Sequence, residues 1–129
     1  MPKVIEAEDL FARMVYSHTA RPITINEVTS MVGPGWHTIV TELVAELLEL
    51  GWTGELGQIK EKFGGLRFYA WNTTVAMDEL IAKAEEQSFT ICEDCGKPGR
   101  TDGWGGKWIK TLCKTHGEAL EAEHEAQNP

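Results

Sequence analysis

The most regular hydrophobic pattern in the chain lies between residues 36 and 50. Apolar side chains recur there at every third or fourth position, which is the spacing of one helix face. They are Trp36, Ile39, Val40, Leu43, Val44, Leu47 and Leu48. Gly33-Pro34-Gly35 interrupts the chain before this pattern, and Gly51 is placed to end a helix. We therefore predict a helix over about 36–50 with one face in a hydrophobic core.

Three other segments have helical patterns. Residues 75–88 carry an apolar stripe, with acidic residues near the positive end of the helix dipole. The stripe consists of Met77, Leu80, Ile81 and Ala84. Residues 7–18 have a similar stripe that ends at His18, and a final helix is expected to begin at Cys113. We predict helices in all three places.

Residues 19–33 allow two interpretations. Thr24 and Glu27 have the spacing of a capping box, which would open a short helix. Ile23, Ile25 and Val28 fit an extended segment equally well. The sequence leaves this choice open.

Two strand-like runs on either side of Gly64-Gly65 predict a β-hairpin over about 57–71. A two-residue turn of this kind needs positive φ at both central positions, which glycine adopts readily. The face expected to pack on the 36–50 helix holds Ile59, Phe63, Leu66, Phe68 and Ala70. The opposite face holds Lys60, Lys62, Arg67, Tyr69 and Trp71. This second face mixes cations with aromatic rings.

The chemistry of the chain is concentrated in two ligand pairs, Cys92-x2-Cys95 and Cys113-x2-His116. They use all three cysteines and one of the four histidines. A two-residue spacer lets one turn supply two ligands, and Zn²⁺ prefers four tetrahedral sulfur or nitrogen donors. Because all four positions are filled, we predict a closed, structural Zn²⁺ site. Alternatives for the fourth ligand are His124, Asp94 and Asp102.

These elements together predict an α+β fold. Residues 1–88 would form a core in which the hairpin packs on helices, and residues 89–129 would form a zinc-binding module packed on that core. Residues 108–112 are expected to be a strand, and Trp36 and Trp108 are expected to be core residues.

The charge pattern adds a candidate binding surface. The chain has a net charge of −8, but residues 56–73 sum to +2 and residues 96–116 to +4. Two basic segments in an acidic chain favour a local patch for an anionic partner and argue against general DNA binding.

We expect a cytoplasmic protein, because cysteines in ligand spacing suit a reducing compartment and no apolar run is long enough for a membrane span or a signal peptide.

Two resemblances follow from these motifs. The order of the ligand pairs over about residues 89–125, a knuckle followed by a pair in the first turn of a helix, resembles a treble-clef zinc finger. Over about residues 33–116 the chain resembles a family of small uncharacterised proteins from bacteria and their phages. The segments that carry this second resemblance are Gly-Pro-Gly-Trp36, the run Lys60-Glu-Lys-Phe-Gly-Gly-Leu-Arg-Phe-Tyr69, and the stretches around both ligand pairs. The family implies a bacterial or phage origin and a zinc motif, and it supplies no catalytic residue.

The function that these features favour is a non-catalytic, zinc-stabilised binding protein that docks on a host macromolecule. A protein partner is expected from the net charge, and the partner could be a host nucleic-acid enzyme or defence system that acidic helix faces inhibit. The alternatives are a nucleic-acid-binding protein that uses the basic and aromatic hairpin face, and an immunity protein that neutralises a toxin. Trp52, Trp71, Trp104 and Trp108 are candidate anchors for the partner. Catalysis is not expected, because no histidine lies between Cys95 and His116 to act as the base of a treble-clef nuclease.

Overall fold

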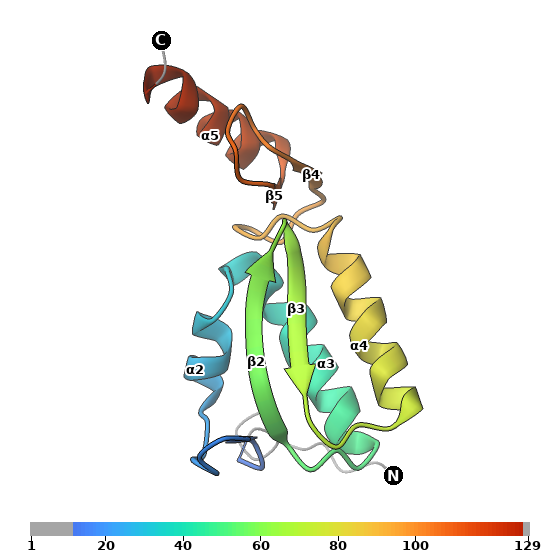
Figure 1. The fold of residues 1–129 in the computed structure, drawn as a ribbon. Helices are drawn as coiled ribbons and strands as arrows, with labels where there is room; N and C mark the ends of the chain where they lie inside the picture. The colour runs from blue at the N-terminus through green and yellow to red at the C-terminus, as the bar shows by residue number, and fades with distance from the viewer. Residues whose placement is uncertain (1–11, 128–129) are drawn as a thin grey trace.

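A β-hairpin backed by a long helix forms the centre of the fold. In the computed structural model, which describes residues 12–127, strands β2 (Glu55–Lys62) and β3 (Gly65–Ala70) are antiparallel. Helix α3 (His37–Glu49) lies behind this hairpin and α4 (Val75–Ser88) lies beside β3 (Figure 1). The C-terminal elements β4 (Arg100–Asp102), β5 (Lys110–Leu112) and α5 (Lys114–Gln127) extend from the turn end of the hairpin (Figure 1). The predicted α+β fold is confirmed.

Helix α3 forms as the hydrophobic spacing predicts. It follows a 3₁₀ turn, η1 (Pro34–Trp36), in which proline supplies a fixed φ at the first position. Gly51, at φ 96°, comes after the last turn. The buried face of α3 consists of Ile39, Val40, Leu43, Val44, Leu47 and Leu48, which pack with Trp36 in the main core.

The hairpin turn lies one residue earlier than the sequence predicts. Lys62 pairs with Gly65, so the turn residues are Phe63 and Gly64, with φ of 54° and 83°. Phe63 is therefore 62% exposed rather than buried, and its predicted place on the core face is wrong. Gly65 lies inside β3 for a packing reason, since a Cβ atom there would overlap the ring of Phe89.

Residues 12–18, the described part of the helix predicted over 7–18, are not helical. Residues 7–11 lie outside the described part, and Val15–Tyr16 form a short strand, β1, parallel to β2. The amide of Val15 donates to the carbonyl of Gly54 at 3.0 Å, and burial of Met14 fixes the segment against the core. Tertiary packing here overrides a helical spacing. The open choice over 19–33 resolves to a short helix, α2 (Ile25–Ser30), whose N-cap Thr24 accepts a hydrogen bond from the amide of Glu27.

Helix α4 covers the outer edge of β3. It buries Met77, Ile81 and Ala84, as its predicted stripe requires. The outward amides of Leu66 and Phe68 donate to the Ser88 hydroxyl at 2.8 Å and to the Glu85 carboxylate at 2.9 Å. Unpaired strand edges invite association with other chains, so these two side chains close an otherwise open edge. None of the helices in residues 12–127 combines the length and apolar content needed to span a membrane.

Replacing Ser88 by alanine should destabilise the fold by about 1–3 kcal/mol, because it leaves the buried amide of Leu66 without an acceptor. Urea unfolding followed by circular dichroism would measure this loss. Ser30→Ala is the matched control, since both hydroxyls donate to the carbonyl three residues earlier but Ser30 is exposed on α2. Equal effects of the two substitutions would contradict a role for Ser88 at the strand edge.

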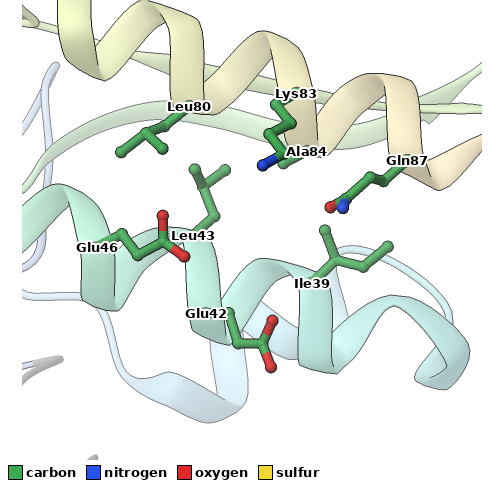
Figure 2. A pocket seen from close by; sticks show the side chains of 8 residues that line it. All are labelled: Ile39, Glu42, Leu43, Glu46, Leu80, Lys83, Ala84 and Gln87. Carbon is green, nitrogen blue, oxygen red and sulfur yellow. The ribbon is translucent and has the colours of Figure 1, made fainter.

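A shallow depression separates α3 from α4 (Figure 2). Its volume is about 130 Å³, and its polar lining consists of Glu42 and Glu46 of α3 with Lys83 and Gln87 of α4. Pockets that hold small organic ligands enclose about 300–1,000 Å³. We therefore interpret the depression as the seam between two packed helices.

Candidate metal centre

The C-terminal segment begins with a tight turn that presents two sulfur atoms. The amide of Cys92 donates to the carbonyl of Lys97 at 2.8 Å, and the amide of Gly96 donates back to the carbonyl of Cys92 at 2.9 Å. Gly96 has φ of 81°, a conformation that glycine adopts without strain. The chain then runs through the β4–β5 hairpin to Cys113, which lies immediately before α5, and His116 lies in the first turn of α5.

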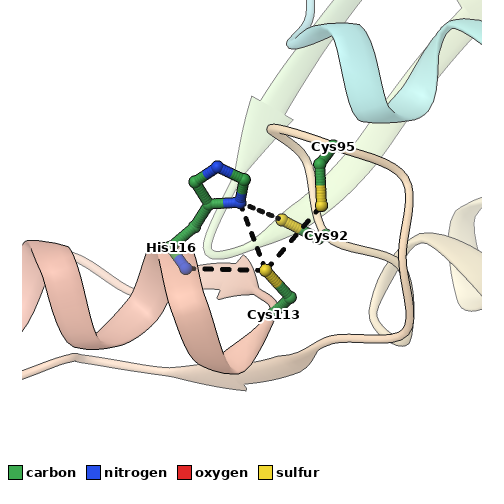
Figure 3. Close-up of side chains that lie close together, drawn as sticks. All are labelled: Cys92, Cys95, Cys113 and His116. Atoms are coloured by element: carbon green, nitrogen blue, oxygen red, sulfur yellow. Dashed lines mark hydrogen bonds between the residues drawn. The ribbon is translucent and has the colours of Figure 1, made fainter.

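The four predicted donors meet between this turn and α5 (Figure 3). The Sγ atoms of Cys95 and Cys113 are 3.7 Å apart. The Nδ1 atom of His116 is 3.6 Å from Sγ of Cys92 and 3.2 Å from Sγ of Cys113. All four donor atoms lie within 4.8 Å of one another, and no disulfide joins the cysteines.

These separations fit four donors arranged tetrahedrally around one metal ion. Bonds of about 2.3 Å to sulfur and about 2.0–2.1 Å to nitrogen place two sulfurs about 3.8 Å apart, and a sulfur and a nitrogen about 3.6 Å apart. The Cys95–Cys113 distance of 3.7 Å and the Cys92–His116 distance of 3.6 Å are close to these values, and the Cys113–His116 distance of 3.2 Å is somewhat shorter. Four donors leave no position for a water molecule or a substrate. The cluster therefore fits a closed metal site.

The local electrostatics bear on which thiol ionises most readily. The backbone amide of His116, which lies 3.5 Å from Sγ of Cys113, lowers the pKa of the Cys113 thiol. For Cys95, the amide of Lys97 acts in the same direction, but burial and the neighbouring thiols outweigh it and raise the pKa. Closely spaced thiols resist simultaneous ionisation unless a cation neutralises them.

The three alternative ligands lie outside this cluster. Nδ1 of His124 is 2.7 Å from the carbonyl oxygen of Trp104. Asp102 accepts hydrogen bonds from the amide of Gly103 and from Arg100. Asp94 is exposed and is not part of the donor group.

A very small hydrophobic cluster supports the metal-ligand segment. It consists of Cys92, Trp104, Leu112 and Cys113, with Leu120 against it. Gly117 of α5 makes room for the indole of Trp104, since a Cβ atom there would overlap the ring. Two of the four buried members are metal-ligand candidates, so the ion would supply much of what holds this segment together.

The exposure of two tryptophans differs from a role that the sequence predicts for each. Trp104, predicted as a partner anchor, is only 1% exposed, and its Nε1 donates to the carbonyl of Lys110. Trp108, predicted both as a core residue and as a candidate anchor, is 80% exposed, so its predicted place in the core is wrong. Trp52 is also buried, with its Nε1 bonded to the carbonyl of Trp71. Trp104 and Trp52 are therefore structural residues and are unavailable to a partner.

The remaining predicted binding residues lie on or just beyond one face of the hairpin. Lys60 is paired directly with Arg67, and Gln58 with Tyr69, so these side chains share a face with Lys62. Trp71 follows β3 and lies over Gly57. Among residues 12–127, no helix covers this face in Figure 1, whereas α3 covers the other.

A junction that the sequence does not reveal joins the metal-ligand segment to the core. The carboxylate of the buried Glu93 accepts from the amide of Gly33 at 3.1 Å and lies 3.7 Å from Nζ of Lys110. The carbonyl of Glu93 accepts from the amide of Gly35 at 2.6 Å. Nε1 of Trp36 donates to the carbonyl of Ile91 at 2.9 Å. The Gly-Pro-Gly-Trp segment is thus the platform on which the first ligand pair rests.

Comparisons with known proteins add no further assignment. No protein-family model matches the chain, and comparisons with curated proteins and with solved structures give no significant match. The resemblance to small bacterial and phage proteins therefore stays a prediction, and the case for a metal centre rests on its geometry.

Proposed function

We propose that this protein is a non-catalytic, zinc-stabilised binding protein that docks on another macromolecule through the exposed face of its β2–β3 hairpin. The observation that carries this proposal is that the donor cluster and the hairpin face have different roles in the fold. The donor cluster fits a closed site, so its chemistry serves structure, while the hairpin face, which no helix of residues 12–127 covers, presents cationic and aromatic side chains. A bacterial or phage origin and a cytoplasmic location belong to the same proposal.

The donor set supports Zn²⁺ as the ion. Three thiolates and one imidazole at tetrahedral separations suit zinc, which has no geometric preference of its own and favours sulfur and nitrogen ligands. The order of a turn, a hairpin and a helix start that contribute two donor pairs supports a treble-clef arrangement. In that arrangement the ion holds β4–β5 and α5 together.

Metal analysis of the purified protein should give one zinc ion per chain. Substitution with Co²⁺ should produce the visible absorption of a tetrahedral, thiolate-rich site. His116→Gln should weaken retention of either ion, while His124→Gln should not, because Nδ1 of His124 contacts a backbone carbonyl instead of the cluster. Loss of zinc from the His124 variant with retention in the His116 variant would overturn the ligand assignment.

The binding role itself can be tested by capture of partners. Zinc-loaded protein immobilised through an engineered tag would be exposed to bacterial lysate, with and without nuclease. The double variant Lys60→Gln/Arg67→Gln should retain zinc and lose the captured partner. A partner that binds wild type and this variant equally would move the docking surface away from the hairpin.

The inhibitor and immunity hypotheses stay predictions. The acidic residues of α5 lie on a helix whose side chains are largely exposed, which is usual for a solvated helix face. Nothing about their placement in residues 114–127 selects a target.

A further inference from the structure

We infer that the partner of the hairpin face is a single-stranded nucleic acid, with its phosphates along Lys60, Lys62 and Arg67 and its bases on Tyr69 and Trp71. This inference rests on the proposed function, since it names the partner class of the same face.

The first step of the inference is the charge on the face. Lys60 and Arg67 are direct cross-strand partners, an arrangement that places like charges side by side and destabilises a sheet. Within residues 12–127, none of Lys60, Lys62 and Arg67 forms an ion pair with a carboxylate. The chain has 20 acidic residues against 12 basic ones, so unpaired cations in a row are not explained by a shortage of acids. An anion bound between them would remove the repulsion.

The second step is the aromatic surface beside the cations. Tyr69 is 46% exposed and Trp71 is 57% exposed, and Nζ of Lys60 lies 5.8 Å from the centre of the Tyr69 ring. Gln58, Tyr69 and Trp71 line an open groove of about 660 Å³, which also includes His18 and Asp78. A groove of this size with two aromatic walls can hold a planar base. Alternating cations and rings are the features by which single strands are bound without sequence preference.

The third step is that the second basic segment meets the first. The hydroxyl of Thr111 donates to the carbonyl of Gly64 at 2.6 Å, so residues 96–116 adjoin the turn end of the hairpin. Phe63 in the turn is exposed, as are Lys107 and Trp108 in the loop between β4 and β5. The two basic segments, which are separated in the sequence, thus meet at the turn end of the hairpin. A single strand fits this face better than a duplex, because exposed rings can stack only on bases that are unpaired and unstacked.

The test is a direct binding titration of the zinc-loaded protein. Fluorescence anisotropy would use labelled DNA and RNA strands of about 20 nucleotides, longer than the site of most single-strand binding folds. Lys60→Gln/Arg67→Gln should weaken binding about tenfold or more and reduce the slope of log affinity against log salt by about 1.4, for two lost phosphate contacts. Tyr69→Ala should weaken binding by about fivefold or more through lost stacking.

The matched control is Arg13→Gln/Lys83→Gln, which removes one arginine before β1 and one lysine on α4, both exposed and neither on β2 or β3. It should leave affinity within about twofold of wild type. Zinc content and circular dichroism would verify that every variant is folded.

Four results would overturn the inference. They are failure of both the DNA and the RNA strand to bind, equal weakening by the control variant, equal affinity for a duplex of the same sequence, and competition by polyglutamate that matches competition by unlabelled strand while Tyr69→Ala has no effect. The last result would identify an acidic protein surface as the partner. If no strand binds but a captured partner is still lost in Lys60→Gln/Arg67→Gln, only this inference fails and the proposed function stands.

Discussion

Replacing Cys113 by serine should release the metal ion and unfold the segment from β4 to α5. Cys113 contributes to both the donor cluster and the small hydrophobic cluster around Trp104. Apparent binding free energies of structural zinc are about 10–16 kcal/mol in small zinc-binding peptides, which is as large as the whole stability of a typical domain. The binding free energy lost with one of four ligands is therefore larger than the stabilisation that Trp104 and its few buried neighbours provide.

Circular dichroism and metal analysis would measure this effect. We expect the variant to lack zinc and the helical signal of α5. Its core around α3 should stay folded and should unfold cooperatively when the sample is heated. Treatment of wild type with a chelator should give the same state as Cys113→Ser, and added zinc should restore only wild type. His18→Gln, a change at an exposed histidine outside the cluster, should alter neither quantity. An unchanged melting curve in the metal-free protein would show that the ion is not structural.

Local patterns predict the elements whose structure depends on a single helix face or on ligand chemistry. The stripe from Trp36 to Leu48 is wide enough to specify α3, and the stripe of α4 specifies its buried face. The two donor pairs identify the candidate centre because metal ligands must recur at spacings that one turn can satisfy. Ligand pairs that one turn supplies can therefore be recognised from their sequence spacing, without knowledge of the tertiary structure.

The errors arise where a distant segment decides the outcome. Gly64-Gly65 predicts a turn at those two residues, but contact with Phe89 requires glycine at 65 and moves the turn to Phe63–Gly64. Trp104 is buried because Gly117, the fourth residue of α5, leaves space for its ring. A glycine inside a helix is unfavourable by itself, so Gly117 is a signal that could have identified a close neighbour. Glu93 gives no comparable signal, since an acidic residue between two ligands looks like ordinary surface.

The close approach of Gly35 to the metal-ligand turn leads to the second large effect. The amide of Gly35 donates to the carbonyl of Glu93, and a Cβ atom at this position would overlap the carbonyl oxygen of Cys92 and lie 2.5 Å from the amide nitrogen of Gly96. Both neighbours are backbone atoms of the turn that carries the first ligand pair, so they cannot move aside without moving Cys92 and Cys95. Gly35→Ala should therefore destabilise the fold by about 3 kcal/mol or more and also weaken zinc binding.

Gly51→Ala separates this overlap from simple backbone strain. Gly51 has φ of 96° but no atom within 4 Å of an added Cβ, so alanine there should cost only about 1–2 kcal/mol and leave zinc affinity unchanged. Urea unfolding and competition with a chromophoric zinc chelator would give the two quantities for each variant. If Gly35→Ala lowered stability but left zinc affinity at the wild-type value, the junction would support the core without positioning the ligands. A joint loss would show instead that the Gly-Pro-Gly-Trp segment and the first ligand pair act as one structural unit, in which core packing sets the geometry of the metal centre.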